Sequence, residues 1–203
     1  MRWGMHWRIG RDSLTGRSSA VYQLGTILPD WFERHPIHRA EESLTRVLKK
    51  ADRIRFMKRG IRRDWLLGTV MHYLCDYCCM AHGGEYYRFY RHRVYEVDSQ
   101  IWFKQIHLQK RAFYMDEQRR FIAALPAVSH ALSTTAMQMS SAGFQAELRR
   151  LILRTVAVRQ SRIDALGSGQ WWTDRHIMSL DVRCAYQLCG AVLHILGELP
   201  QAG

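Results

Sequence analysis

Apolar side chains recur at helical spacing along most of the chain, and glycine or proline follows most of these segments. The clearest segment runs from Asp64 to about Ala81. Its apolar positions advance by four, three, four and three residues: Leu66, Val70, Tyr73, Tyr77 and Met80. Gly83 and Gly84 then supply a stop signal. This periodicity predicts a helix over residues 64–81.

The same pattern predicts helices along the rest of the chain. The expected ranges are 19–28, 37–57, 85–106, 144–166 and 173–199, with less regular helical material over 116–139, interrupted near Pro126. No segment reads convincingly as a strand, and no linker rich in Pro, Gly or Ser separates two halves. We therefore expect an all-α fold in which residues 1–203 form a single-domain, multi-helix bundle.

Composition agrees with a helical globular protein and adds a strong positive charge. The 203 residues are 47% hydrophobic, which is enough for one buried core, and only four are proline. Thirty Lys and Arg residues oppose 18 Asp and Glu residues, so the formal net charge is +12. The resulting field attracts phosphate esters, nucleic acid or acidic lipid head groups. Charge therefore indicates a class of partner and leaves the fold open.

Cysteine usage and hydropathy bear on the location of the protein. Three of the five cysteines crowd into residues 75–79, which is unlike a disulfide framework and favours a reducing compartment. The chain as given has no secretory signal, and its apolar run over 184–197 is too short to span a bilayer. We expect a cytoplasmic protein without a transmembrane segment. The basic block of residues 46–63 holds nine Lys and Arg. It could dock on an anionic membrane surface or on nucleic acid, or it could be a solvated helix end.

Histidines and carboxylates recur at four-residue spacing near the middle of the chain. His72 and Asp76 lie on one face of the predicted helix 64–81, and His92 and Glu96 repeat this spacing in the next one, with His82 between the pairs. One such pair alone is more often a surface hydrogen bond or a core histidine, but the repetition favours a metal site. A mixed imidazole and carboxylate set is typical of a hydrolytic zinc site that keeps positions open for water.

These residues also carry a family resemblance. The string LGTVMHYLCDYCCMAH, followed by HRVYE, resembles the bacterial zinc-dependent phospholipase C family, whose members carry HxxxD, a further His and then HxxxE. The upstream LGTILPDWF is similar to the family segment that bears an early Asp ligand. The resemblance implies that Asp30 is this ligand and also the candidate general base. It further implies a His ligand at the start of the next helix, for which we prefer His38 and hold His35 in reserve.

The resemblance implies a cluster of two or three zinc ions between the helices. The residues around one ion would be Asp30, His38, His72 and Asp76. The residues around a second ion would be His82, His92 and Glu96. Asp76 would bridge to a third ion that His6 helps to hold. The resemblance covers about the first hundred residues, and the remainder is expected to pack the back of the bundle.

These features favour a zinc-dependent hydrolase that acts on a phosphodiester, most similar to a phospholipase C and with phospholipid as its substrate. The single-strand-specific zinc nucleases are similar in fold and metal set, so a nuclease or nucleotide phosphatase is one alternative. A second alternative is a non-catalytic, zinc-stabilised module that binds anionic lipid or nucleic acid. Hydrolysis of a phosphodiester distinguishes the enzymes from the binding module.

Overall fold

The computed structural model describes residues 3–14, 19–29, 40–82, 89–125, 135–167 and 173–199. In chain order its elements are α1 (Trp3–Ser13), α2 (Ala20–Gly25), α4 (Ala40–Arg55), α5 (Ile61–Cys78), the 3-10 turn η2 (Met80–His82), α6 (Phe89–Ala123), α8 (Ser141–Leu166) and α9 (Arg175–Ile195). No strand occurs in these ranges, so the all-α prediction is confirmed. None of the described helices is both long and apolar enough to cross a membrane.

Two helices differ from the sequence prediction. Residues 3–13 form α1, which no pattern predicted, because Gly4 and Gly10 obscure its short apolar stripe. The helix α6 is continuous, although the sequence predicted separate segments over 85–106 and 116–139. Its buried face continues through His107 and Tyr114, whereas the charged residues between them face solvent. These charges mask the helical period in the sequence.

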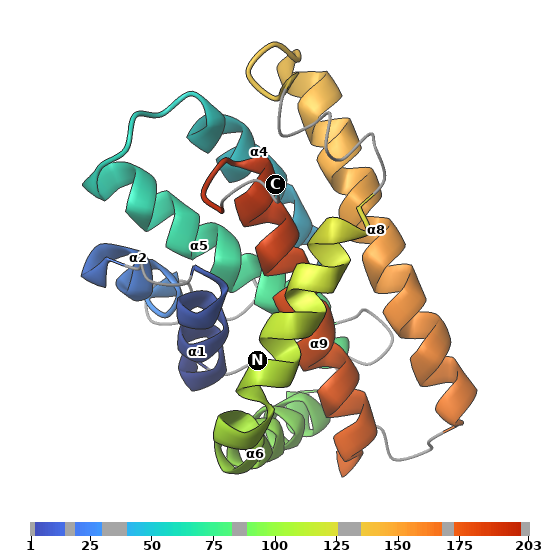
Figure 1. Ribbon diagram of the computed structural model, residues 1–203. Coiled ribbons are helices and arrows are strands. Elements are labelled where there is room, and N and C mark those ends of the chain that lie inside the picture. The colour runs from blue at the N-terminus through green and yellow to red at the C-terminus, as the bar shows by residue number, and fades with distance from the viewer. Residues whose placement is uncertain are drawn as a thin grey trace.

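The helix α9 lies in the middle of the bundle (Figure 1). It packs against α1, α5, α6 and α8, and most of its side chains from Val182 onwards are buried. Its first turn is capped by the Asp174 side chain, which accepts hydrogen bonds from the backbone N–H groups of His176 and Ile177. The helix α5 is similarly buried, between α1, α2, α4 and α9. Both helices are therefore apolar on more than one face.

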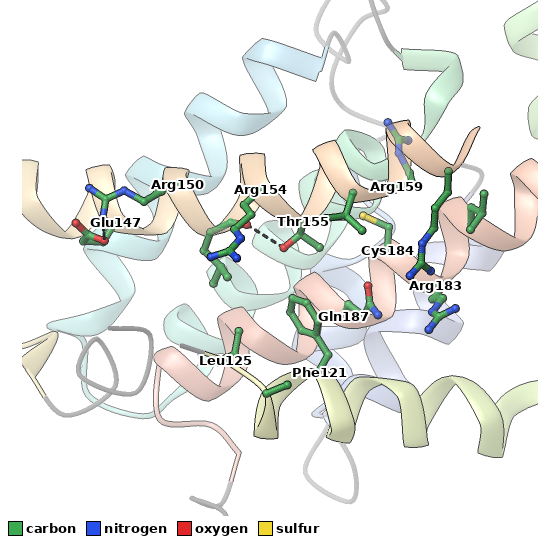
Figure 2. A pocket seen from close by; sticks show the side chains of 15 residues that line it. Phe121, Leu125, Glu147, Arg150, Arg154, Thr155, Arg159, Arg183, Cys184 and Gln187 are labelled. Carbon is green, nitrogen blue, oxygen red and sulfur yellow. Dashed lines mark hydrogen bonds and ion pairs between the residues drawn. The ribbon is translucent and has the colours of Figure 1, made fainter. Parts of the chain in front are cut away.

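The helices α6, α8 and α9 leave a pocket between them (Figure 2). Its volume is about 450 Å³, and arginine side chains from α8 and α9 stand among apolar ones in its lining. This pocket lies apart from the helix α5, which carries His72 and Asp76, since none of its lining residues comes from α5.

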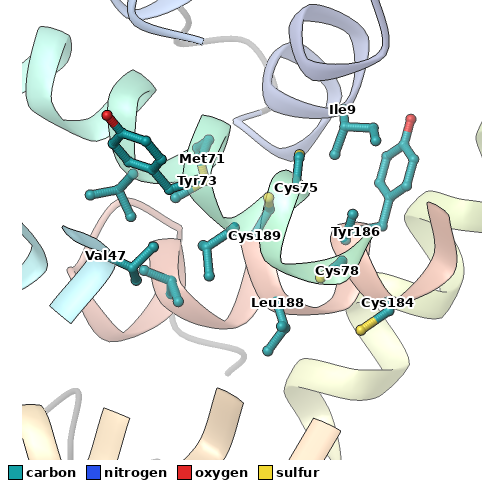
Figure 3. Packing of buried hydrophobic residues seen from close by; sticks show 14 of the residues in the cluster. Ile9, Val47, Met71, Tyr73, Cys75, Cys78, Cys184, Tyr186, Leu188 and Cys189 are labelled. Atoms are coloured by element: carbon teal, nitrogen blue, oxygen red, sulfur yellow. The ribbon is translucent and has the colours of Figure 1, made fainter. Parts of the chain in front are cut away.

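The five cysteines are free and buried in the core. Figure 3 shows four of them where α5 faces α9. The hydrogen bond between Cys75 and Cys189, together with burial, raises the pKa of the Cys75 thiol well above its ordinary value. Burial and the hydrogen bond with Cys184 do the same to the pKa of Cys78. These thiols therefore pack as small apolar side chains.

Two glycines allow α2 to lie directly against α5. A Cβ atom on Gly68 would collide with the carbonyl oxygen of Tyr22, and one on Gly25 would lie 2.6 Å from the carbonyl oxygen of Trp65. Only glycine at both positions allows the two backbones to approach this closely. The approach brings Thr26, which directly follows α2, against the middle of α5.

The basic block of residues 46–63 is in part structural. Arg55 is buried and donates hydrogen bonds to backbone carbonyls that include that of Met139, at 2.7 Å. Arg63 is also buried and donates to the carboxylate of Glu198 at 2.6 Å. These two arginines therefore tie α4 and the start of α5 to the segments before α8 and after α9, instead of facing an anionic partner.

Candidate metal centre

His6, His72 and Asp76 form a buried group where α1 meets α5. Nε2 of His6 lies 3.2 Å from Oδ1 of Asp76, and Nε2 of His72 lies 3.2 Å from Oδ2 of the same carboxylate. The two imidazoles approach each other to 2.7 Å between their Nδ1 atoms. The four-residue spacing places His72 and Asp76 on one face of α5, and His6 comes from the helix that the sequence did not predict.

A backbone carbonyl orients the His72 ring. Nδ1 of His72 lies 3.1 Å from the carbonyl oxygen of Thr26, which can only accept a hydrogen bond. The Nδ1 atom therefore donates, and Nε2 faces Asp76. An imidazole held by a carbonyl on its other nitrogen is typical of metal-binding histidines. No pattern in the sequence indicated Thr26, because this contact depends on the close approach of Gly25 and Gly68.

His82, His92 and Glu96 form a second group between η2 and α6. The Nε2 atoms of His82 and His92 are 3.0 Å apart, and Oε1 of Glu96 lies 3.7 Å and 3.6 Å from them, respectively. The Glu96 side chain is 19% exposed, whereas Asp76 in the first group is 1% exposed. The second group therefore lies nearer the surface.

Asp76 connects the two groups. Its Oδ1 atom lies 3.9 Å from Nε2 of His82, in addition to its contact with His6. The carboxylate thus stands between the first group, on α1 and α5, and the second group, on η2 and α6. The two groups form one continuous cluster of imidazole and carboxylate side chains.

The structure brings together six of the eight side chains predicted as metal ligands. They are His6, His72, Asp76, His82, His92 and Glu96. Asp30 and His38 lie outside the described residues, as does the reserve ligand His35. The roles of Asp30 as ligand and general base, and the choice between His38 and His35, stay predictions.

The charges in this cluster suit a cation. Burial raises the pKa of Asp76, but His72, His6 and His82 outweigh it and hold the pKa well below its ordinary value. Burial raises the pKa of Glu96 as well, but the neighbouring His82 and His92 help to hold this pKa below its ordinary value. Burial and the adjacent His82 lower the pKa of His92 to about 4. Near neutral pH the cluster therefore offers two carboxylates and a neutral His92 ring, the forms that bind zinc.

The donor atoms of both groups fit zinc. Each group offers three nitrogen or oxygen atoms, all within 4.8 Å of one another, and neither group contains a thiolate. Three protein ligands leave at least one position of a zinc ion open, which distinguishes catalytic from structural zinc sites. The residues present therefore match a hydrolytic zinc centre.

A buried carboxylate on α9 fixes the elements that carry the second group. Oδ2 of Asp181 accepts hydrogen bonds from the backbone N–H of Met80 at 2.8 Å and from the hydroxyl of Tyr95 at 2.5 Å. Its Oδ1 atom accepts from Arg159 at 2.8 Å. Met80 begins the turn that ends at His82, and Tyr95 precedes Glu96 on α6. Asp181 thus holds η2 against α6, and nothing in the local sequence marks it.

A different histidine serves the core of the fold. Nε2 of His107 lies 2.8 Å from Oδ2 of Asp12, and the Tyr186 hydroxyl donates to the same oxygen at 2.9 Å. These three side chains come from α6, α1 and α9 and are buried. They tie the three helices together, and none of them belongs to the two candidate metal groups.

Comparison with known families identifies the chain. The family of zinc-dependent phospholipase C matches residues 5–145, well over half of the chain and further than the first hundred residues that carried the resemblance. Searches of curated proteins and of solved structures gave no significant match. The matched range includes all six clustered side chains, from His6 to Glu96. The chain therefore belongs to the zinc-dependent phospholipase C family.

Proposed function

We propose that this chain is a zinc-dependent hydrolase that cleaves the phosphodiester of a phospholipid in the manner of a phospholipase C. One observation carries the proposal: two groups of zinc-binding side chains adjoin through Asp76, whose Oδ1 atom lies 3.9 Å from Nε2 of His82. Membership of the family supports the same reaction. The net charge of +12 is suited to the anionic phosphate group of such a substrate.

The residues of the two groups have distinct roles in this proposal. His6, His72 and Asp76 would hold zinc in the buried part of the cluster, and His82, His92 and Glu96 would hold it nearer the surface. Bound zinc supplies an acidified water and charge stabilisation at phosphate oxygens. Glu96 is the most exposed of the six side chains, so the substrate would approach from its side.

Asp30 and His38 complete the proposed centre. Asp30 would bind metal and orient the attacking water as general base, and His38 would be a further ligand. As general base, Asp30 would take a proton from the water whose oxygen attacks phosphorus, and would return it to the glycerol oxygen as the bond from that oxygen to phosphorus breaks. Substitution of Asp30 by Asn should therefore reduce the rate of hydrolysis more than it reduces the amount of bound zinc.

Product analysis with phosphatidylcholine tests the proposed reaction. Zinc-loaded protein should release diacylglycerol and phosphocholine, and His72→Ala and Glu96→Ala should lose metal and rate together. The matched control is His176→Ala, because His176 is exposed and lies outside both groups. It should retain both metal and rate.

Two results would replace this proposal by its alternatives. Hydrolysis of single-stranded DNA in place of phospholipid would indicate a nuclease. The family match gives that alternative no support, since it names a phospholipase C. Full zinc occupancy without hydrolysis of either substrate would indicate the non-catalytic binding module.

A further inference from the structure

The pocket between α6, α8 and α9 has an apolar lining and a cationic end. Phe121 of α6, Leu125 just after that helix and Leu151 of α8 contribute to its apolar part. Figure 2 shows Glu147 at one end of the pocket, and Arg159 and Arg183 toward the other. The volume of about 450 Å³ lies in the range of small-molecule sites.

Positive charge in this pocket far exceeds negative charge. Five arginines line it, Arg150, Arg154, Arg159, Arg162 and Arg183, whereas Glu147 is its single acidic residue. Glu147 is already paired with Arg150, at 2.9 Å. Within the described part of the chain, neither Arg154 nor Arg162 forms an ion pair. The pocket therefore carries uncompensated charge next to an apolar surface.

Two buried donor groups in the lining also lack acceptors. Arg159 is 8% exposed, and its Nε atom has no hydrogen-bond partner among the described residues. The Nε atom of Arg183 is likewise buried and without an acceptor there. Asp181 and Glu117 pair with the terminal nitrogens of these two arginines and leave both Nε–H groups unused. A buried donor without an acceptor costs free energy, which an anionic ligand would recover.

We propose that this pocket binds an anionic phospholipid. Its phosphate would lie among Arg159, Arg162 and Arg183, and would accept from the two unused Nε–H groups and from the Arg162 guanidinium. One acyl chain would follow the apolar lining past Val158 and Phe121. An anionic phospholipid matches both parts of the lining. A free anion would leave the apolar residues without contacts, and a neutral lipid would leave the arginines without an anionic partner.

Calorimetric titration of the zinc-loaded protein with monomeric dihexanoylphosphatidic acid tests this site. Arg162→Gln and Val158→Asp should each weaken binding about tenfold or more, by removing a phosphate donor and by placing a charge in the apolar lining. Both side chains are exposed, so neither change disturbs the core. The control is Arg149→Gln, an exposed arginine of α8 outside the pocket, which should bind as the unaltered chain does.

Three further titrations distinguish a phospholipid site from a site for a simple anion, a site for a neutral lipid and binding at the metal centre. Inorganic phosphate and dihexanoylglycerol should each bind at least tenfold more weakly than the phospholipid, and equal binding of either one would overturn the lipid site. Glu96→Ala should retain binding, whereas its loss would assign the lipid to the metal centre. No binding, or binding that Arg162→Gln leaves unchanged, would also overturn the proposal. Because binding at this pocket does not require hydrolysis, a chain without hydrolytic activity still tests this pocket.

Discussion

Oδ1 of Asp76 lies 3.9 Å from Nε2 of His82, although the two side chains belong to different ligand groups. Asp76 lies in the last turn of α5, and His82 is the last residue of the 3-10 turn that follows α5. The contact links the buried group on α1 and α5 to the more exposed group on α6. A change at Asp76 should therefore affect both groups, whereas a change at Glu96 should affect one.

Zinc binding should release a proton from His82. Burial lowers the pKa of His82, but the Asp76 carboxylate and the Cys79 side chain outweigh it and hold the pKa well above 6.5. His82 is therefore protonated at neutral pH in the metal-free chain, and its Nε2–H donates to the neutral ring of His92, 3.0 Å away. A ligand nitrogen must be deprotonated, so zinc displaces this proton.

Zinc affinity should therefore depend on pH. It should rise with pH until the pKa of His82 is passed. His92 contributes nothing to this rise near neutral pH, because its pKa is lowered to about 4. Calorimetry in buffers of different ionisation enthalpy should detect release of about one proton from His82 at pH 7. An affinity that is constant between about pH 6 and 8, with no proton released, would contradict displacement of a proton from His82 by zinc.

Gly68→Ala should destabilise the fold and disturb the orientation of His72. The added methyl group would collide with the carbonyl oxygen of Tyr22, and relief of this contact requires α2 to move away from α5. We expect a loss of about 2 kcal/mol in the free energy of unfolding, together with weaker zinc binding, because Thr26 moves with α2. Denaturant unfolding and zinc titration measure the two effects.

Gly4→Ala is the matched control for that change. Gly4 is also helical, but a Cβ atom there would be 3.7 Å from its nearest neighbour, the Gln100 side chain, which is ordinary contact. Alanine is the better helix former, so this variant should gain about 0.5 kcal/mol. Equal stabilities of the two variants would contradict the close approach of α2 and α5.

Asp181→Asn should weaken zinc binding by the second group, although it removes none of the ligands in that group. Asp181 accepts hydrogen bonds from Met80 and Tyr95, which place η2 and α6 beside each other. Loss of the carboxylate also leaves Arg159 without its charged partner. Changes around a metal site of this kind typically cost about 10 to 100-fold in affinity or activity. Asp116→Asn, which breaks exposed ion pairs on α6, is the control and should have no effect on zinc affinity.

The sequence predicted what depends on local spacing. His72 with Asp76, and His92 with Glu96, follow from the helical repeat, and the helices of the C-terminal half follow from their long apolar stripes. The helix α1 was missed because its two glycines are unfavourable in a helix, and tertiary burial of Met5 and Ile9 compensates for them.

Contacts between distant segments could not be predicted in this way. Thr26 reaches His72 only because Gly25 and Gly68 let two helices touch. Asp181 reaches η2 across the bundle, from a helix whose sequence is typical of the core. Such residues have no local pattern, since their partners are set by packing instead of by spacing.

The zinc content of the purified protein tests the central claim most directly. Elemental analysis of protein prepared without chelator should find about two zinc ions or more per chain, one for each group of three ligands. Asp76→Asn should lose most of the metal from both groups while retaining its helical circular dichroism. A folded, unaltered chain that contains no zinc, or an Asp76→Asn variant with full zinc content, would contradict the account.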